Sequence, residues 1–439
     1  MKIYIETLGC PKNEVDSQMA AGILQRAGHQ ITQNREEAEL ILVNTCAFIQ
    51  DAKEESINTI FELSRLKEEN CRMLVVSGCL GQRYNEELAK EMPEADLIIG
   101  VNDYSDLPEL IEKTQKEGRQ HLRREACGCF EEFGGILPEI RNASAYLKIA
   151  EGCNNRCTYC IIPYIRGEYR SRKKEEILAE AKRLAEQGAK ELVLIAQDVT
   201  NYGRDLYEDY ELADLLRDLK TVPELKWIRL MYCYPDKITR RLVEEIRDNP
   251  KVCKYIDMPV QHGSDVILAG MNRKSRKAEI ERVVKLMRQE IPEMVIRTTL
   301  IVGFPGEKTA EFCELYDFVA EMQFDRLGVF AYSKEEGTPA ALRKPQVRSD
   351  VKARRRETIM QLQQGISLEK NLQRIGAVYE VLVEEGPDED GVYIGRTRYD
   401  AAEIDNSVIF VSEKPLRPGT FVDVKITDAF DYDLTGEAL

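Results

Sequence analysis

Short apolar runs alternate with stretches of helical periodicity along most of the chain. Within residues 1–118 the apolar runs lie at 2–8, 40–44, 72–77 and 97–100, and helix-like segments separate them. Strands that alternate with helices in this way form parallel sheets with helices on both faces. We therefore expect an N-terminal α/β domain with a doubly wound parallel sheet.

A second and longer alternation occupies residues 144–369. Helical stretches separate six further strand-like runs, at 146–150, 192–196, 228–231, 255–258, 295–301 and 326–330. Six such units are fewer than the eight that close a full barrel. The pattern predicts a partial (βα)6 barrel, with its active site at the carboxyl ends of the strands.

The pattern changes again in residues 370–439. Short β-type runs at 378–384, 392–396, 407–411 and 421–427 are separated by Gly, Pro and Asp. This spacing predicts a small antiparallel β-barrel of the OB type.

Residues 119–143 join the two α/β regions and show no apolar period, so we interpret them as a linker. Cys127 and Cys129 lie in it. A C-x-C pair can bind metal, but no third ligand is near in the sequence. We prefer a solvent-facing or accessory role for these two cysteines.

The composition narrows the class of protein. No apolar run is long enough to span a membrane and the first residues do not resemble a signal peptide, so we expect a cytoplasmic protein. Twelve cysteines in that compartment indicate metal or redox chemistry rather than disulfides. The formal net charge of −15 disfavours non-specific binding to polyanions and favours a basic partner.

Three cysteines, Cys153, Cys157 and Cys160, follow the first strand of the central region with the spacing C-x3-C-x2-C. A loop this tight cannot form useful disulfides among three thiols, so the thiolates are expected to bind metal. A structural zinc site takes four protein ligands. A 4Fe–4S cluster held by three thiolates instead keeps one iron open for a ligand that is not protein. The alternatives are a zinc knuckle or a chance group of cysteines.

A second set of cysteines is dispersed over the N-terminal domain. Cys10, Cys46 and Cys79 follow the first, second and third predicted strands. Loops beyond the carboxyl ends of adjacent parallel strands converge on one crevice, so these thiols are expected to share one metal centre. The alternative is three buried cysteines that serve as small core residues. Cys71, between a helix and a strand, lacks this placement and is expected to be structural.

With these two cysteine sets and the C-terminal barrel, the chain resembles the radical S-adenosylmethionine (SAM) methylthiotransferases over essentially its whole length. The barrel resembles their TRAM domain. Several stretches are similar to the branch of the family that modifies ribosomal protein uS12: Thr7-Leu-Gly-Cys-Pro-Lys-Asn13, Ala150-Glu-Gly-Cys-Asn-Asn-Arg-Cys157, Arg166-Gly-Glu-Tyr-Arg-Ser-Arg172, Ile195-Ala-Gln-Asp198 and Tyr232-Cys-Tyr-Pro-Asp236.

The resemblance implies a domain order of 1–118, 144–369 and 370–439, with two 4Fe–4S clusters and SAM as cofactors. It implies that the enzyme methylthiolates the β-carbon of an aspartate of uS12, with SAM as methyl donor and as source of the 5'-deoxyadenosyl radical. The second cluster would deliver the sulfur. An electron donor such as flavodoxin or ferredoxin and a sulfur source are the other implied partners.

The resemblance also suggests contacts with SAM. Tyr159 would lie near the adenine, and a rim of strand-end residues would complete the site: Gln197, Gln261, Arg297, Gly303 and Gly306. A guanidinium matches a carboxylate in fork geometry, so Arg297 could pair with the SAM carboxylate. Its alternative is a surface ion pair. The basic run 166–172 is a candidate for holding the target aspartate.

Two other functions compete with this interpretation. The sister activity methylthiolates adenosine in tRNA with the same clusters, but residues 370–439 hold 7 Lys and Arg against 15 Asp and Glu, a net charge of −8. A surface that binds RNA should be basic, so we expect no direct tRNA binding. The other is an electron carrier without catalysis. Such proteins usually give each cluster four protein ligands and have no use for a large α/β barrel.

Overall fold

The computed structural model describes residues 1–125 and 140–439. Cys127 and Cys129, for which we predict an accessory role, lie outside the described residues. The chain forms two compact units. The first comprises 1–139, 148–180 and 333–341, and the second comprises 140–147, 181–332 and 342–439. Among the described residues, no helix is both long and apolar enough to cross a membrane.

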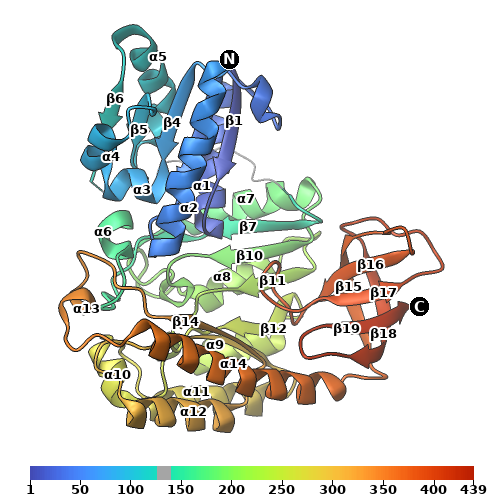
Figure 1. Cartoon of the computed structure of the whole chain (residues 1–439). Coiled ribbons are helices and arrows are strands. Elements are labelled where there is room, and N and C mark those ends of the chain that lie inside the picture. Colours follow the sequence, from blue (N-terminus) through green and yellow to red (C-terminus); the bar gives the residue numbers. More distant parts are fainter. Residues whose placement is uncertain (126–139) are drawn as a thin grey trace. The chain divides into compact units, whose positions relative to one another are not determined.

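The N-terminal sheet has the strand order β2-β1-β3-β4-β5-β6, and every neighbouring pair is parallel (Figure 1). Its strands are β1 (Lys2–Thr7), β2 (Gln30–Ile31), β3 (Leu40–Thr45), β4 (Met73–Ser77), β5 (Leu97–Ile99) and β6 (Gln120–Leu122). The accompanying helices are α1 (Pro11–Arg26), α2 (Gln50–Ser64), α3 (Gly78–Arg83), α4 (Asn85–Glu91) and α5 (Leu107–Glu117). The predicted parallel sheet is confirmed.

The middle strands β3, β4 and β5 are buried at every position, as expected when helices cover both faces of a parallel sheet. The prediction missed the edge strands β2 and β6. β6 falls inside the segment that we interpreted as a linker, and three residues are too short to show a period.

The segment 148–180 is part of the first unit. It contains β8 (Ala150–Glu151), β9 (Arg170–Ser171), α6 (Ile162–Arg166) and the first part of α7 (Lys174–Glu186). Ile161 and Ile165 pack in one hydrophobic cluster with residues of the N-terminal domain such as Val76 and Leu80. The loop with the C-x3-C-x2-C spacing is therefore anchored on the N-terminal core.

The central sheet has the order β14-β13-β12-β11-β10-β7, and its pairs from β10 to β14 are parallel. Its strands are β7 (Ser144–Lys148), β10 (Glu191–Ile195), β11 (Trp227–Leu230), β12 (Val252–Asp257), β13 (Val295–Val302) and β14 (Arg326–Ala331). The helices of this region are α8 (Leu212–Leu219), α9 (Arg240–Asp248), α10 (Asp265–Gly270), α11 (Lys277–Glu290), α12 (Thr309–Met322), α13 (Pro339–Leu342) and α14 (Ser349–Leu372). The six-stranded open sheet confirms the partial barrel.

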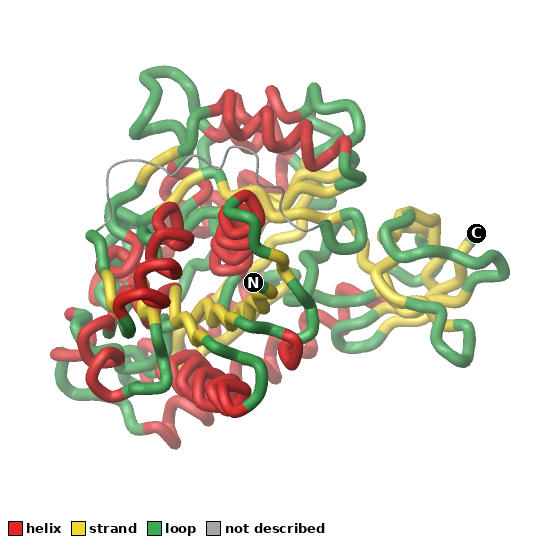
Figure 2. The backbone as a smooth tube through the Cα atoms, turned by 90° about the horizontal axis from the view of Figure 1, so that it is seen from above, coloured by secondary structure: helices red, strands yellow, loops and turns green. Residues whose placement is uncertain are grey.

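The C-terminal strands close into a barrel in the order β15-β16-β17-β19-β18, seen in yellow beside the C terminus in Figure 2. They are β15 (Val378–Glu385), β16 (Val392–Thr397), β17 (Val408–Val411), β18 (Phe421–Ala429) and β19 (Leu434–Ala438). The pair β17–β19 is parallel and the others are antiparallel. The predicted small barrel is confirmed, but its last strand β19 was missed.

Candidate functional site

Cys10, Cys46 and Cys79 each lie just beyond the carboxyl end of a strand. Cys10 is the N-cap residue of α1, Cys46 follows β3, and Cys79 is in the first turn of α3. The strands that precede them, β1, β3 and β4, are neighbours in the sheet. The order β2-β1-β3-β4-β5 puts the topological switch point between β1 and β3, which is where open α/β sheets bind ligands.

The three thiols also influence one another. Burial and the neighbouring Cys79 raise the pKa of Cys46 to about 12. Burial raises the pKa of Cys79 as well, while the guanidinium of Arg166 acts in the opposite direction. A buried thiol of this kind gives up its proton when a metal takes the place of that proton.

A glycine with positive φ precedes three of the cysteines. Gly9, Gly78 and Gly152 have φ of +96°, +88° and +80° and stand directly before Cys10, Cys79 and Cys153. A side chain at each would collide with its surroundings: at Gly9 a Cβ would be 3.0 Å from the Cys46 Sγ. At Gly78 it would be 2.6 Å from the Thr45 carbonyl oxygen, and at Gly152 2.1 Å from the Glu168 carbonyl oxygen. The backbone thus approaches its neighbours closely at each turn into a cysteine.

The donors of each set, three cysteine thiols, suit an iron–sulfur cluster. A four-iron cluster binds each thiolate to a different iron, so its ligands need not meet at one point. Three soft thiolate donors without an imidazole in the set also match this chemistry.

The second set lies in the loop between β8 and α6. Cys153 and Cys157 are buried and Cys160 is partly exposed. The Cys153 backbone N–H donates to the Gly167 carbonyl at 3.1 Å, and the Cys160 N–H donates to the Cys157 carbonyl at 3.0 Å. Tyr159 lies within this loop and is partly buried. All six cysteines of the two sets are therefore in the first compact unit.

A buried polar network in this unit links α1 to the segment that carries the second set. Arg166, at the end of α6, donates to Asp16 of α1 at 2.6 Å and to Glu151 of β8 at 3.2 Å. Lys148 of β7 donates to the same two carboxylates. Two cations and two carboxylates thus neutralise one another away from water.

The network corrects one prediction and adds residues that we missed. Arg166 and Arg172 are buried, and Arg172 is paired with Glu180 at 2.6 Å, so neither is available to hold a substrate aspartate. Asp16 and Lys148 were not predicted. A signal existed in α1, where Lys12, Asn13, Asp16 and Ser17 are polar at helical spacing and all buried.

In the second unit, the predicted rim residues Gln197 and Gln261 follow β10 and β12, and the turn from Gly303 to Gly306 follows β13. Gln261 has a φ of +74°, and its buried side-chain oxygen has no hydrogen-bond partner. A buried amide in a strained backbone position at a strand end is a feature of ligand sites.

The turn after β13 is closed by Glu307. Its carboxylate accepts from the backbone N–H groups of Gly303 at 2.6 Å and Phe304 at 3.2 Å, and Arg355 of α14 donates to it at 2.7 Å. The glycine turn therefore has a fixed shape.

The interpretation of Arg297 as a rim residue is wrong. It is the third residue of β13, five positions before the end of that strand, or about 16 Å at the usual rise of a strand. Its guanidinium donates to Asp257 at 2.8 Å and to Asp405 at 3.2 Å. The side chain is 15% exposed. The residue thus forms a buried ion pair, and both of its carboxylate partners belong to the chain.

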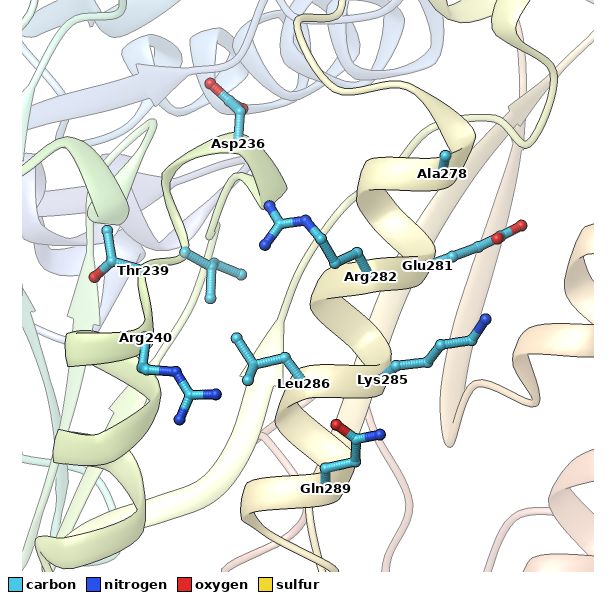
Figure 3. A pocket seen from close by; sticks show the side chains of 10 residues that line it. Asp236, Thr239, Arg240, Ala278, Glu281, Arg282, Lys285, Leu286 and Gln289 are labelled. Atoms are coloured by element: carbon cyan, nitrogen blue, oxygen red, sulfur yellow. The ribbon is translucent and has the colours of Figure 1, made fainter.

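A separate groove of about 710 Å³ lies between the start of α9 and α11 (Figure 3). Arg240 and Arg282 extend into it from these two helices. None of the cysteines or of the predicted SAM-binding residues lines it.

Three parts of the chain match known families. Residues 2–100 match the uncharacterised protein family UPF0004, residues 147–319 match the radical SAM superfamily, and residues 375–439 match the TRAM domain.

Characterised relatives match along the whole chain. The chain is 50% identical to the ribosomal protein uS12 methylthiotransferase RimO of Acetivibrio thermocellus, over 100% of this chain and 98% of that protein. It is 48% identical to the protein of the same name from Clostridioides difficile, over 100% of this chain and 99% of that protein.

Solved structures share the fold at low sequence identity. The radical SAM methyltransferase TsrM of Kitasatospora setae aligns with a TM-score of 0.56 at 13% identity, over 88% of this chain and 79% of that one. The cobalamin-dependent radical SAM enzyme OxsB aligns with a TM-score of 0.54 at 12% identity, over 82% of this chain and 56% of that one.

Proposed function

Because this chain belongs to the radical SAM methylthiotransferases, in the family of RimO, we propose that it methylthiolates the β-carbon of an aspartate in ribosomal protein uS12. The observation that carries the proposal is the presence of both three-cysteine sets in one compact unit. Such a substrate places the enzyme in the cytoplasm.

We assign the cofactors to these cysteines. Cys153, Cys157 and Cys160 would hold the 4Fe–4S cluster that binds SAM, and Cys10, Cys46 and Cys79 would hold the second cluster. When bound, the cofactors supply a radical that can abstract hydrogen from an unactivated carbon, the methyl group, and the sulfur for the new bond. Three protein ligands in each set leave a coordination position for a ligand from outside the protein.

The chain's own residues fix where this chemistry takes place. The glycine turns before Cys10, Cys79 and Cys153 hold these thiols at the ends of strands. Packing of Ile161 and Ile165 on the N-terminal core holds the loop of one set on the domain that carries the other. Pre-organisation of this kind lowers the entropy that must be lost before the reacting groups meet.

For SAM we retain Tyr159, Gln197, Gln261, Gly303 and Gly306 as binding residues. The buried side-chain oxygen of Gln261 can accept a hydrogen bond that the protein does not supply. The turn at Gly303 has a shape fixed by Glu307, which accepts from its backbone N–H groups. Arg297 is removed from the set.

The acidic barrel supports a protein substrate over tRNA. Its residues carry a net charge of −8, and its buried Asp400 and Asp405 are neutralised by Arg326 and Arg297. The remaining acidic side chains would attract a basic ribosomal protein and repel phosphate. A one-electron donor such as flavodoxin or ferredoxin and a sulfur source complete the set of partners.

Mass spectrometry tests the substrate. Protein uS12 and tRNA are isolated from cells with and without the gene for this protein. We expect uS12 from cells that carry the gene to be heavier by one methylthio group on an aspartate, and tRNA to be the same in both. Loss of methylthioadenosine from tRNA with unmodified uS12 in both strains would overturn the proposal.

A further inference from the structure

Arg166 touches one of the N-terminal cysteines directly. Its Nη2 lies 3.5 Å from the Cys79 Sγ and donates to the Asn13 side-chain oxygen at 2.6 Å. Its Nη1 is held by Asp16 and Glu151. The side chain is 3% exposed, so water does not screen the guanidinium from the sulfur.

The surroundings leave the guanidinium little freedom. Gly167, with a φ of +75°, ends α6 just after Arg166. Asp16 and Glu151 both pair with it, and Lys148 binds the same two carboxylates. A charged group in such a site is fixed, because removal of any partner would leave a buried charge unpaired.

We infer that Arg166 is a positioning residue that donates an N–H···S hydrogen bond to the Cys79 thiolate and raises the reduction potential of the N-terminal cluster. The inference rests on the proposed function, which makes Cys79 a cluster ligand. Reduction adds one negative charge to a cluster and its thiolates, and a cationic hydrogen-bond donor stabilises that form more than the oxidised one. Arg166 belongs to the segment that also carries Cys153, Cys157 and Cys160, so this segment supplies part of the environment of the other cluster.

The test uses full-length protein with Cys153, Cys157 and Cys160 replaced by Ala, so that only the N-terminal cluster remains. Two double variants are made on this background. Arg166→Gln with Asp16→Asn removes the donor, and Lys148→Gln with Asp16→Asn removes the other cation as a matched control. Each double variant loses one positive and one negative charge, so the network stays neutral in both. Iron content and the midpoint potential of the cluster are measured, with dithionite as reductant.

We expect the variant without Arg166 to shift the equilibrium toward the oxidised cluster at least tenfold, a fall of about 59 mV for one electron. The variant without Lys148 should stay within about threefold of the background. Equal shifts in both variants, or no shift in either, would overturn the inference.

Two further measurements address proteins that take up no iron. If the Arg166→Gln variant takes up no iron, Arg166→Lys is titrated instead; a lower potential than the background supports the inference and an unchanged one contradicts it. If the background protein itself takes up no cluster, the assignment of Cys10, Cys46 and Cys79 in the proposed function has failed, before any change at Arg166.

Discussion

Cys153, Cys157 and Cys160 stand within one loop, whereas Cys10, Cys46 and Cys79 come from three loops that the order of β1, β3 and β4 brings together. The first set depends on local chain geometry. The second depends on the order and register of the strands in a parallel sheet. Both sets use the same local device, a glycine of positive φ directly before a cysteine. Because one set lies in a single loop and the other comes from three loops, substitutions should impair the two sets in different ways.

The largest expected effect distinguishes the two cysteine sets by their functions. Replacing Cys153, Cys157 and Cys160 by Ala should abolish formation of 5'-deoxyadenosine from SAM and lower the iron content by about half, since each set would carry one of two clusters. Anaerobic reconstitution followed by iron analysis and chromatography measures both. Continued SAM cleavage would show that these residues do not hold the SAM-cleaving cluster.

The matching variant for the N-terminal set replaces Cys10, Cys46 and Cys79 by Ala. We expect the same loss of iron, reductive SAM cleavage that persists, and no methylthiolated product. Radical formation needs SAM on its own open iron, whereas formation of the C–S bond needs a sulfur held nearby. Full iron content, or normal product, would identify these cysteines as core residues.

Gly78 tests how far the distributed set depends on sheet geometry. Gly78→Ala should destabilise the protein by about 3 kcal/mol or more, because a Cβ there meets the Asn44 side-chain oxygen at 2.2 Å in addition to the strain of positive φ. Gly28 has a φ of +86° but no atom within 4 Å of an added Cβ, so Gly28→Ala should cost only about 1 kcal/mol. Denaturant unfolding compares the two, and iron loss should accompany only the change at Gly78. Equal stability losses would contradict the role of crowding.

Arg297 gives the smallest effect and tests the correction. Arg297→Ala should leave the SAM concentration needed for cleavage unchanged and lower stability at pH 7 by about 2 kcal/mol, because Asp257 and Asp405 lose a buried partner. Burial raises the pKa of Asp405 even with Arg297 present. Without the arginine this folded-state pKa should rise further, so the variant's deficit should shrink as the pH falls and Asp405 becomes protonated.

Unfolding of wild type and variant at pH 7 and pH 5 measures this trend. A higher SAM requirement in the variant would restore Arg297 to the cofactor site, and a deficit that grows as the pH falls would contradict the account of Asp405.

The three folded regions, and the six cysteine positions with their expected roles, could be predicted from the amino-acid sequence. The apolar run 40–44 located a buried strand, because a strand buried on both faces must be apolar along its length. Parallel strands end at the same edge of a sheet, so the convergence of Cys10, Cys46 and Cys79 followed from their places after strands. The short strands β2, β6 and β19 were not predicted, because two to five residues without a clear period do not indicate strand pairing.

The partners of the buried charges could not be predicted and became known from the folded chain. Arg297 pairs with Asp405 across 108 positions, and Arg166 meets Cys79 across 87. From the sequence both arginines were candidates for ligand contacts. The sequence does not show whether the partner of an arginine is a substrate or a carboxylate far along the chain. An ion pair between remote residues leaves no periodic pattern, and its members are identified only when the folded chain excludes water from around them.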